Sequence, residues 1–314
     1  MAEKTKLDMR VLLTIRDRAF LQALYAFDGV LSSRQVRKYF YPGIRDSTFW
    51  NRMRRLEQAR YIAKPTRRER YVHPVPETVY WLGPPGIAFV AAQQGIHEDA
   101  SRIKTDNAKK RLAKQLRKQG IFYKPWPDWL RLKHQIAVNE IRFIVEAAAQ
   151  ESGLSFDLWI PESYWRADPV KVSYMFDRRT HDGQKVVEKT ATVIPDGFFA
   201  VSRSVGGGPL AYLVEVDMRT EHNPRVVREK IRPGLAFLAS ELYQRRTGLR
   251  YGRWLICTTG SKRVENMKIA AEQATNRPWF YFSSFDQLSP ETFFNQPIWS
   301  VIGKDEPVAL LDPI

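Results

Sequence analysis

Two carboxylates end one of the most apolar stretches of the sequence. The run 211–214 has the composition of a buried strand and continues into Glu215, Val216 and Asp217. Because side chains two positions apart on a strand point to the same face, Glu215 and Asp217 are expected side by side. A buried pair of acids is costly unless a cation lies close by, so this spacing indicates a cation site.

A third acid stands at the end of a neighbouring strand, where Asp196 follows the alternating run 190–194 and Pro195. If Asp196 faces the same way as Glu215 and Asp217, three carboxylates converge, as in the Mg²⁺ or Mn²⁺ sites that hydrolyse phosphodiesters. The acids then hold the metal and the metal activates water. The alternative leaves Asp217 in solvent beyond the strand and pairs Glu215 with an arginine.

Other catalytic chemistries have less support. The five histidines stand far apart, which argues against the metal site of rolling-circle relaxases. The glycines 206–208 lack the lysine and hydroxyl residue of a phosphate-binding loop. We interpret the H-x-x-R spacing of His222 and Arg225 as a turn and a helix start. The one cysteine, Cys257, excludes internal disulfides and is expected in the core.

The elements around these acids are expected in the order helix, three strands, helix, strand, helix, strand. The spacing of apolar residues predicts a helix over 131–150, strands over 156–160, 190–200 and 211–217, a helical segment over 225–239, a strand over 253–258, a helix over 264–273 and a strand over 279–282. Pro233 is expected to interrupt the middle helical segment. The sequence therefore predicts an α/β (α+β) domain around a central mixed sheet.

This order, with a Pro-Asp motif ending at Asp196 and the acids Glu215 and Asp217, resembles the PD-(D/E)xK nuclease superfamily, the restriction-endonuclease-like fold. The resemblance implies that Asp196 and Glu215 bind Mg²⁺ or Mn²⁺, with Glu140 as the acid of the first helix. The family usually places a lysine two residues after the glutamate, where Asp217 stands here. In some members a lysine on the following helix substitutes, which points to Lys230.

Positive charge is concentrated at the front of the chain. The 314 residues hold 50 Lys and Arg against 34 Asp and Glu, a net charge of +16. Residues 1–130 contain 26 of the basic and 12 of the acidic residues, so most of the excess lies there. Such an excess favours polyanionic partners, most simply nucleic acid. A surface charged only for solubility explains the sign of the charge but not its asymmetry.

Three short helices are expected in this basic region. They cover 14–27, a segment that runs from a cap at Ser32 or Ser33 to Pro42, and a segment that starts from a cap at Asp46 or Ser47. In the third helix, Phe49, Met53 and Leu56 face inward by their spacing, while its arginines lie on another side.

Two extended segments, 61–62 and 78–82, follow the third helix and enclose a basic tip. Three helices and a hairpin across residues 12–92 resemble the winged-helix family, which implies that the third helix and the hairpin bind duplex DNA. The alternative is a protein-docking module with a solvated helix. The residues expected at the DNA are Arg45, Thr48, Arg52, Arg54 and Arg55 of the third helix, Arg67, Arg68 and Arg70 of the tip, and Lys109 and Lys110 further along.

A basic stretch over 98–124 has Leu112 and Leu116 as its only aliphatic pair at helical spacing, so it is either a polar helix or a mobile tether. It either extends the DNA footprint through Lys109 and Lys110 or acts as a spacer. The aromatic cluster of Phe122, Tyr123, Trp126 and Trp129 is expected to begin the next core. We therefore expect a winged-helix domain over 1–95, a basic connector over 96–128 and a nuclease-like domain over 129–314.

Several motifs occur together in this chain: Val79-Tyr80-Trp81-Leu82 followed by Gly86, His134 to Glu140, Ile194-Pro195-Asp196, and Glu215-Val216-Asp217 with Thr220-Glu221 and Lys230. Over about residues 12–245 this combination resembles the replication-relaxation family. The resemblance implies a bacterial protein of plasmids and integrative elements that acts on double-stranded DNA in their replication or mobilisation.

Two classes of function follow from these expectations. In the first, the protein binds a specific duplex sequence and nicks or cleaves it with Mg²⁺ or Mn²⁺. In the second, it is a non-enzymatic regulator or recruitment factor whose degenerate nuclease fold binds a replication, mobilisation or transposition protein. A homodimer suits either role. Since the sequence has no apolar run of membrane-spanning length and no secretory leader, we expect a cytoplasmic protein without membrane contact.

Overall fold

A computed structural model of the chain describes residues 11–96, 105–118, 124–180, 183–203, 208–218 and 227–311. The chain divides into two compact units, 1–139 and 140–314. The division falls inside helix α7 (Leu132–Glu151), which the apolar spacing predicts over 131–150. The basic stretch expected as a separate connector therefore belongs to the first unit.

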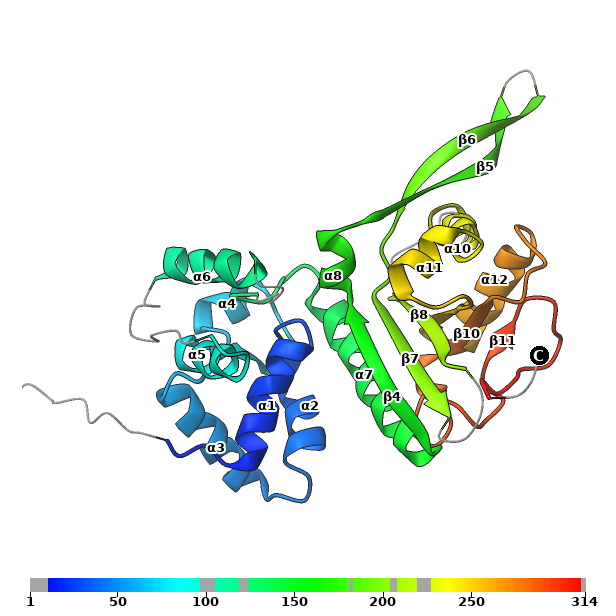
Figure 1. The fold of residues 1–314 in the computed structure, drawn as a ribbon. Helices are drawn as coiled ribbons and strands as arrows, with labels where there is room; N and C mark the ends of the chain where they lie inside the picture. The colour runs from blue at the N-terminus through cyan, green and yellow to red at the C-terminus, as the bar shows by residue number, and fades with distance from the viewer. Residues whose placement is uncertain are drawn as a thin grey trace, which may run out of the picture. The chain divides into compact units, whose positions relative to one another are not determined.

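The first unit opens with three helices, as the sequence predicts (Figure 1). They are α1 (Ile15–Ala26), α2 (Ser33–Phe40) and α3 (Asp46–Gln58). Thr14 and Ser32 form complete capping boxes at the starts of α1 and α2. The expected cap of α3 at Asp46 or Ser47 is wrong, because its N-cap is Arg45 and no described side chain makes a capping hydrogen bond there.

The core of the first unit lies between these helices. Phe49, Met53 and Leu56 of α3 are buried, as their spacing predicts. The ring of Phe49 packs edge-on against Tyr41, and that of Tyr41 against Phe20, with centroids 5.7 and 6.4 Å apart. Aromatic packing from α1 to α3 therefore fixes which face α3 turns outward.

A three-stranded antiparallel sheet accompanies the helices, in the order β1 (Leu31–Ser32), β3 (Val79–Leu82), β2 (Ile62–Ala63). The extended segments near 61–62 and 78–82 thus pair as expected. The tip between them is not a simple loop, since it contains helix α4 (Arg67–Val72). The helix starts with a capping box in which Thr66 and Glu69 bond to each other's backbone N–H groups.

Helix α5 (Pro84–Gln93) is missing from the sequence prediction, because its first residues resemble a turn. A Cβ atom at Gly83 or Gly86 would lie 2.0 or 2.1 Å from the backbone oxygen of Arg60 or Tyr61. Both glycines therefore let the start of α5 approach the end of α3 closely.

Within the described part of the basic stretch, residues 106–118 form helix α6 (Asp106–Lys118), so this part is a helix and not a tether. Leu112 and Leu116, its aliphatic pair, are both buried. Lys110, Arg111 and Lys114 of the same helix are exposed.

A mixed sheet of six strands in the described residues forms the second unit, in the order β11-β10-β9-β8-β7-β4. The strands are β4 (Leu154–Pro161), β7 (Gly197–Arg203), β8 (Leu210–Asp217), β9 (Arg253–Thr258), β10 (Phe280–Ser284) and β11 (Ser300–Val301). Strands β4, β7 and β8 are antiparallel neighbours, while β8, β9 and β10 run parallel. The α/β class and the central mixed sheet are confirmed.

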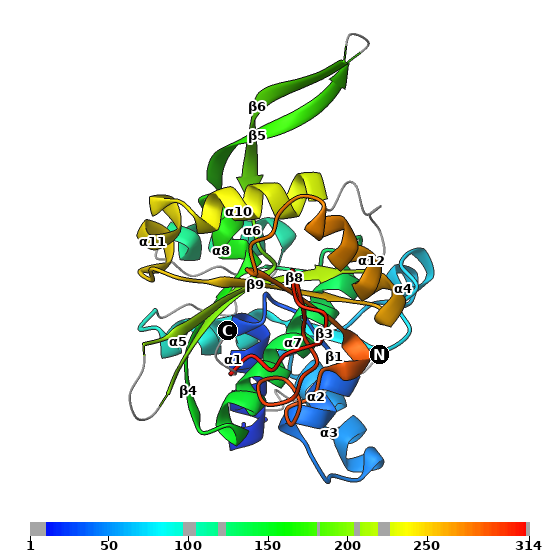
Figure 2. The ribbon, with the colours of Figure 1, turned by 90° about the vertical axis from the view of Figure 1, so that its right-hand side faces the viewer.

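Helices cover both faces of this sheet, with the second half of α7 on one face and α10 to α12 on the other (Figures 1 and 2). The helices and turns are α8 (Glu162–Ala167), the π-helix η2 (Val227–Ile231), α10 (Arg232–Leu238), α11 (Glu241–Thr247), α12 (Ser261–Glu272) and the 3₁₀ turn η3 (Phe285–Gln287). None of the described helices combines the length and apolar character needed to cross a bilayer.

A two-stranded ribbon projects from the second unit (Figure 1). It consists of β5 (Val170–Thr180) and β6 (Gly183–Val193), paired antiparallel along their whole length. The sequence predicts only a strand that starts at 190 and a turn near 181–183, of which His181 and Asp182 lie outside the described residues. The expected continuation of that strand to 200 is wrong, because Pro195 and Asp196 separate β6 from β7.

Candidate functional site

Asp17 is a buried carboxylate that joins the three helices of the first unit. The hydroxyl of Tyr41 and the Nε of Arg52 donate hydrogen bonds to its Oδ1, at 2.6 and 2.9 Å. Its Oδ2 accepts from Thr14 and forms an ion pair with Arg52. Burial alone raises the pKa of Asp17, but the hydrogen bonds from Arg52, Thr14 and Tyr41 outweigh it and hold the pKa below its usual value.

Arg52 therefore points to the core and not to the open face of α3, where the sequence places it. Its side chain is only 17% exposed, and its Nη2 also donates to the backbone oxygen of Leu12 at 2.8 Å. The physical reason for the difference is Asp17, whose buried charge needs a cation. Arg52 acts as a structural residue.

The other expected DNA contacts in this region are open to solvent. Arg45, Thr48, Arg54 and Arg55 on α3 are exposed, as are Arg67, Arg68 and Arg70 on α4. The guanidinium of Arg54 donates to Oδ1 of Asn51 at 3.0 Å, which holds it along the helix surface. Their contact with DNA stays a prediction.

A hollow of about 500 Å³ lies beside the turn that joins α2 to α3. Arg34, Arg37 and Lys38 of α2 line it together with Trp50, an indole that is 46% exposed. These four residues are absent from the sequence prediction, although the basic run of α2 is a visible signal for them. Arg34 and Lys38 extend the basic surface from α3 to α2, whereas Arg37 pairs with Asp46 at the start of α3.

Two lysines of α6 complete the predicted basic set. Lys109 lies 3.1 Å from Asp106 of the same helix. Lys110 is exposed, and its ammonium lies 5.7 Å from the ring centroid of Trp126. Trp126 itself is 37% exposed, so its expected place in a core is wrong. Phe122 and Tyr123 of the same predicted cluster lie outside the described residues.

In the second unit, Glu215 and Asp217 occupy the end of β8 and are both 8% exposed. They continue the face on which Ala211 and Leu213 pack into the apolar core. Phe198 of β7 belongs to the same core, which places Asp196, two residues earlier, on the same side of the sheet. The predicted shared face of the acids therefore agrees with the structure.

Lys230 reaches Glu215, with its Nζ 2.6 Å from Oε1. The lysine lies in η2, directly before the helix that begins at Arg232 with Pro233 in its first turn. A Cβ atom at Gly234 would lie 2.8 Å from the ring of Trp254, so this glycine lets the helix pack closely on the sheet. The interruption expected at Pro233 is present and does not prevent contact.

Asp217 is buried and bound to other partners. Its Oδ2 accepts from Oγ1 of Thr258 at 2.7 Å and from Nε of Arg263 at 2.9 Å. The alternative with Asp217 in solvent and Glu215 beside an arginine is therefore wrong, because Glu215 pairs with a lysine and Asp217 with the arginine. A role of Asp217 in holding a metal is weakened by these contacts.

Asp196 is fixed at the start of β7. Its Oδ2 accepts from the backbone N–H of Val216 at 2.7 Å, and its own N–H donates to Val214 at 2.9 Å. The next residue, Gly197, has no space for a side chain, since a Cβ atom there would lie 2.5 Å from the ring of Trp159. Asp196 thus lies directly beside the strand that carries Glu215.

The described residues contain no group of three or more His, Cys, Asp or Glu side chains suited to hold a metal ion. The expected convergence of three carboxylates is therefore wrong for Asp196, Glu215 and Asp217, and Glu140 of α7 does not complete such a group. Binding of Mg²⁺ or Mn²⁺ by Asp196 and Glu215 stays a prediction. Thr220, Glu221, His222 and Arg225 lie outside the described residues.

The structure is that of a mixed α/β protein with exposed basic helices in one unit and, in the other, a lysine paired with a buried carboxylate at the end of a sheet strand. The family model for replication-relaxation proteins matches residues 21–250, more than half of the chain. The chain therefore belongs to the replication-relaxation family, which suggests a role in the replication or relaxation of plasmids or other mobile elements. No curated protein and no solved structure matches it.

Proposed function

We propose that this protein binds duplex DNA of a plasmid or mobile element through its first unit, in a sequence-specific manner, and so acts in replication or mobilisation. The observation that carries the proposal is the excess of basic residues in 1–130 together with their exposure on α3 and α4. Solvated charges on a helix beside a short antiparallel sheet suit the winged-helix mode of DNA binding.

Arg45, Thr48 and Arg55 of α3 are the side chains proposed to reach the bases or nearby phosphates. Arginine suits both, because its planar guanidinium pairs with guanine or phosphate through two hydrogen bonds. The arginines of α4 and the basic residues of α2 lie on elements next to α3 in the chain and provide further phosphate contacts. The buried pair of Asp17 and Arg52 holds the helices that carry these side chains.

The proposal is tested by replacing two exposed arginines at once. The double variant Arg45→Ala, Arg55→Ala is expected to weaken binding to a duplex fragment of the host element by about ten-fold or more, measured by fluorescence anisotropy. Arg245→Ala is the matched control, since this arginine of α11 is 72% exposed and pairs with Glu241. Equal binding by the double variant and the control would refute the proposed interface.

Metal-dependent nicking by the second unit is a second candidate, favoured by the contact between Lys230 and Glu215. A divalent ion held by Asp196 and Glu215 would supply an activated water. Lys230 would assist the attacking water beside Glu215, which is the role that the nuclease resemblance assigns to a lysine. The competing candidate is a regulator that recruits a partner protein, a role that a homodimer also suits, and it needs no such chemistry.

Nicking is tested with supercoiled DNA of the host element in Mg²⁺ or Mn²⁺. We expect the wild-type protein to relax it and the variants Asp196→Ala and Lys230→Met to fail, while both variants still bind duplex DNA. Thr190→Ala, a change on the exposed ribbon, is the control for the second unit. If the wild type and the three variants relax the DNA equally, or if none of them does, nicking by this site is refuted and the recruitment function is favoured.

A further inference from the structure

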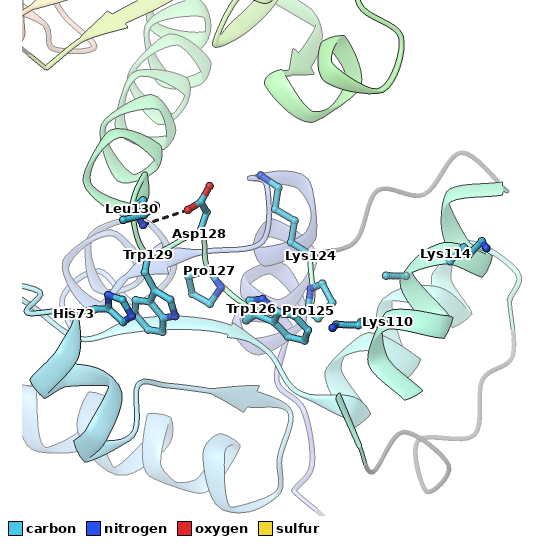
Figure 3. Close-up of a pocket in the computed structure, with 11 residues that line it drawn as sticks. His73, Lys110, Lys114, Lys124, Pro125, Trp126, Pro127, Asp128, Trp129 and Leu130 are labelled. Atoms are coloured by element: carbon cyan, nitrogen blue, oxygen red, sulfur yellow. Dashed lines mark hydrogen bonds between the residues drawn. The ribbon is translucent and has the colours of Figure 1, made fainter. Parts of the chain in front are cut away.

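An open cleft of about 800 Å³ lies within the first unit, between α6 and the segment 124–130 (Figure 3). Two tryptophans and three lysines line it: Trp126 and Trp129, and Lys110, Lys114 and Lys124. Its volume is in the range of small-ligand sites, about 300 to 1,000 Å³. Lysines exceed acids among its lining residues, with Asp128 as the one acid among them, so an anionic occupant is favoured.

The two indoles have different surroundings. Trp129 is fixed by stacking on His73, with ring centroids 5.2 Å apart and planes 2° from parallel, and it packs edge-on against Trp81. Trp126 is 37% exposed, with the ammonium of Lys110 at 5.7 Å from its ring centroid. A solvated indole next to a cation offers a flat surface for another ring and a charge for its phosphate.

The backbone that carries Trp126 is stiff. Pro125 and Pro127 flank it, and the proline rings limit the conformations of this segment. The segment is tied down further at Asp128, whose Oδ1 accepts from the N–H of Leu130 at 3.2 Å. The indole is thus held in the cleft before any ligand arrives, which lowers the entropic cost of binding.

We propose that this cleft, which we call the tryptophan cleft, binds unpaired nucleotides of single-stranded DNA. A base stacks on the indole of Trp126, while the exposed Lys110 and Lys114 neutralise neighbouring phosphates. Lys124 contributes less, because its ammonium lies 3.5 Å from the carboxylate of Asp28. Duplex DNA is a poor occupant, because its base faces are covered by their neighbours in the stack. The inference rests on the proposed DNA-binding function and adds a second substrate form, the single strand that opening or nicking of a duplex releases.

The test measures binding of the full-length protein to a labelled oligothymidylate of about twelve nucleotides by fluorescence anisotropy. Trp126→Ala is expected to raise the dissociation constant about ten-fold or more, and Trp126→Phe to restore most of the affinity, because stacking needs a ring. Tyr251→Ala is the matched control, since this aromatic residue of the second unit is 74% exposed. An abasic strand of equal length should bind equally to wild type and Trp126→Ala.

Three outcomes would overturn the inference. They are unchanged oligothymidylate binding by Trp126→Ala, the same loss with the abasic strand, and tighter binding of an oligouridylate than of the DNA. The two proposals can fail separately. If the Arg45→Ala, Arg55→Ala variant loses duplex binding while Trp126→Ala binds the single strand as well as the wild type does, the single-strand site is refuted and the proposed duplex function is supported. If the double variant binds duplex DNA normally while Trp126→Ala loses single-strand binding, the duplex interface is refuted and the single-strand site is supported.

Discussion

Arginines of the same helix have different roles in this protein. Arg52 and Arg55 lie one turn apart on α3, yet Arg52 pairs with buried Asp17 while Arg55 is exposed. Helical spacing places both on the polar side, so periodicity cannot separate them. Asp17 precedes Arg52 by 35 residues, and only the folded structure shows that the two meet.

Replacing Arg52 tests this assignment. Arg52→Ala leaves the carboxylate of Asp17 buried without its cation, which is expected to lower the free energy of unfolding by about 2 to 3 kcal/mol. Arg55→Ala, which removes an exposed side chain of the same type, should change it by less than about 0.5 kcal/mol. Urea denaturation followed by circular dichroism gives both values. A similar small effect of the two variants would contradict the structural role.

The same carboxylate predicts how stability depends on pH. Since the folded-state pKa of Asp17 lies below its unfolded value of about 3.9, its contribution is present above that value and is lost as pH falls through the folded pKa. Asp17→Asn removes this titration, so its unfolding free energy should fall less steeply below about pH 4 than that of the wild type. Parallel pH profiles of the two proteins would exclude Asp17 as a source of the acid sensitivity.

The contact of Lys230 with Glu215 could be predicted from the family resemblance but not from the residue spacing. Nothing in the spacing of the sequence joins Lys230 to Glu215, fifteen residues earlier, and the nuclease resemblance alone points to it. The structure brings the two within 2.6 Å. It also shows why Asp217 could not be assigned from the sequence, since its partner Arg263 follows the next strand and needs the parallel pairing of β8 and β9 to come close.

At the scale of elements, segments with a clear local signal were predictable, whereas the two-residue strand β1 and the long strand β5 were missed. Helix α7 and strands β4 and β8 follow clear apolar patterns, and they occur where those patterns place them. Strand β1 has two residues and depends on pairing with β3, about 48 positions later, so local sequence carries no signal for it. Helix α4 had a readable signal, the capping box from Thr66 to Glu69.

The ribbon of β5 and β6 is an element whose removal should leave the fold intact. Val172 and Val193 at its base belong to the core, whereas Met175 and Val186 further out are exposed. Replacing 174–189 by Asn-Gly closes a short hairpin at the pair Ser173 and Thr190. We expect an unfolding free energy within about 1 to 2 kcal/mol of the wild type, because a two-stranded ribbon adds little stability by itself. The shortening also removes the contacts of Arg232 with the backbone oxygen of Met175 and the ring of Phe176.

The control for the shortened ribbon is a substitution at its buried base. Val172→Ala removes buried methyl groups from the core and should lower the unfolding free energy by about 1 to 2 kcal/mol although it deletes no backbone. Thermal denaturation of the shortened protein and of Val172→Ala gives the comparison. Loss of the cooperative transition on shortening would mean that the outer ribbon is part of the folding unit.

At the scale of the whole molecule, the two units differ in net charge and in the burial of their charged side chains. The first unit combines exposed arginines with an excess of positive charge, while Glu215 and Asp217 of the second unit are buried and bound to Lys230 and Arg263. Residues 131–314 contain 24 basic and 22 acidic residues and are nearly neutral, so the basic surface of the first unit is the main source of attraction for a polyanion. The net charge of +16 therefore acts mostly through one part of the chain.

This division predicts how strongly salt controls duplex binding. If the first unit neutralises about 6 to 10 phosphates, affinity should fall by about 10³ to 10⁵ between 50 and 200 mM salt, because each contact releases condensed counterions. In a plot of log affinity against log salt, Arg45→Ala with Arg55→Ala should reduce the slope by about 2, while Arg245→Ala leaves it unchanged. Affinity that is insensitive to salt would mean that phosphate contacts do not drive binding, and the charge of the first unit would then need another partner.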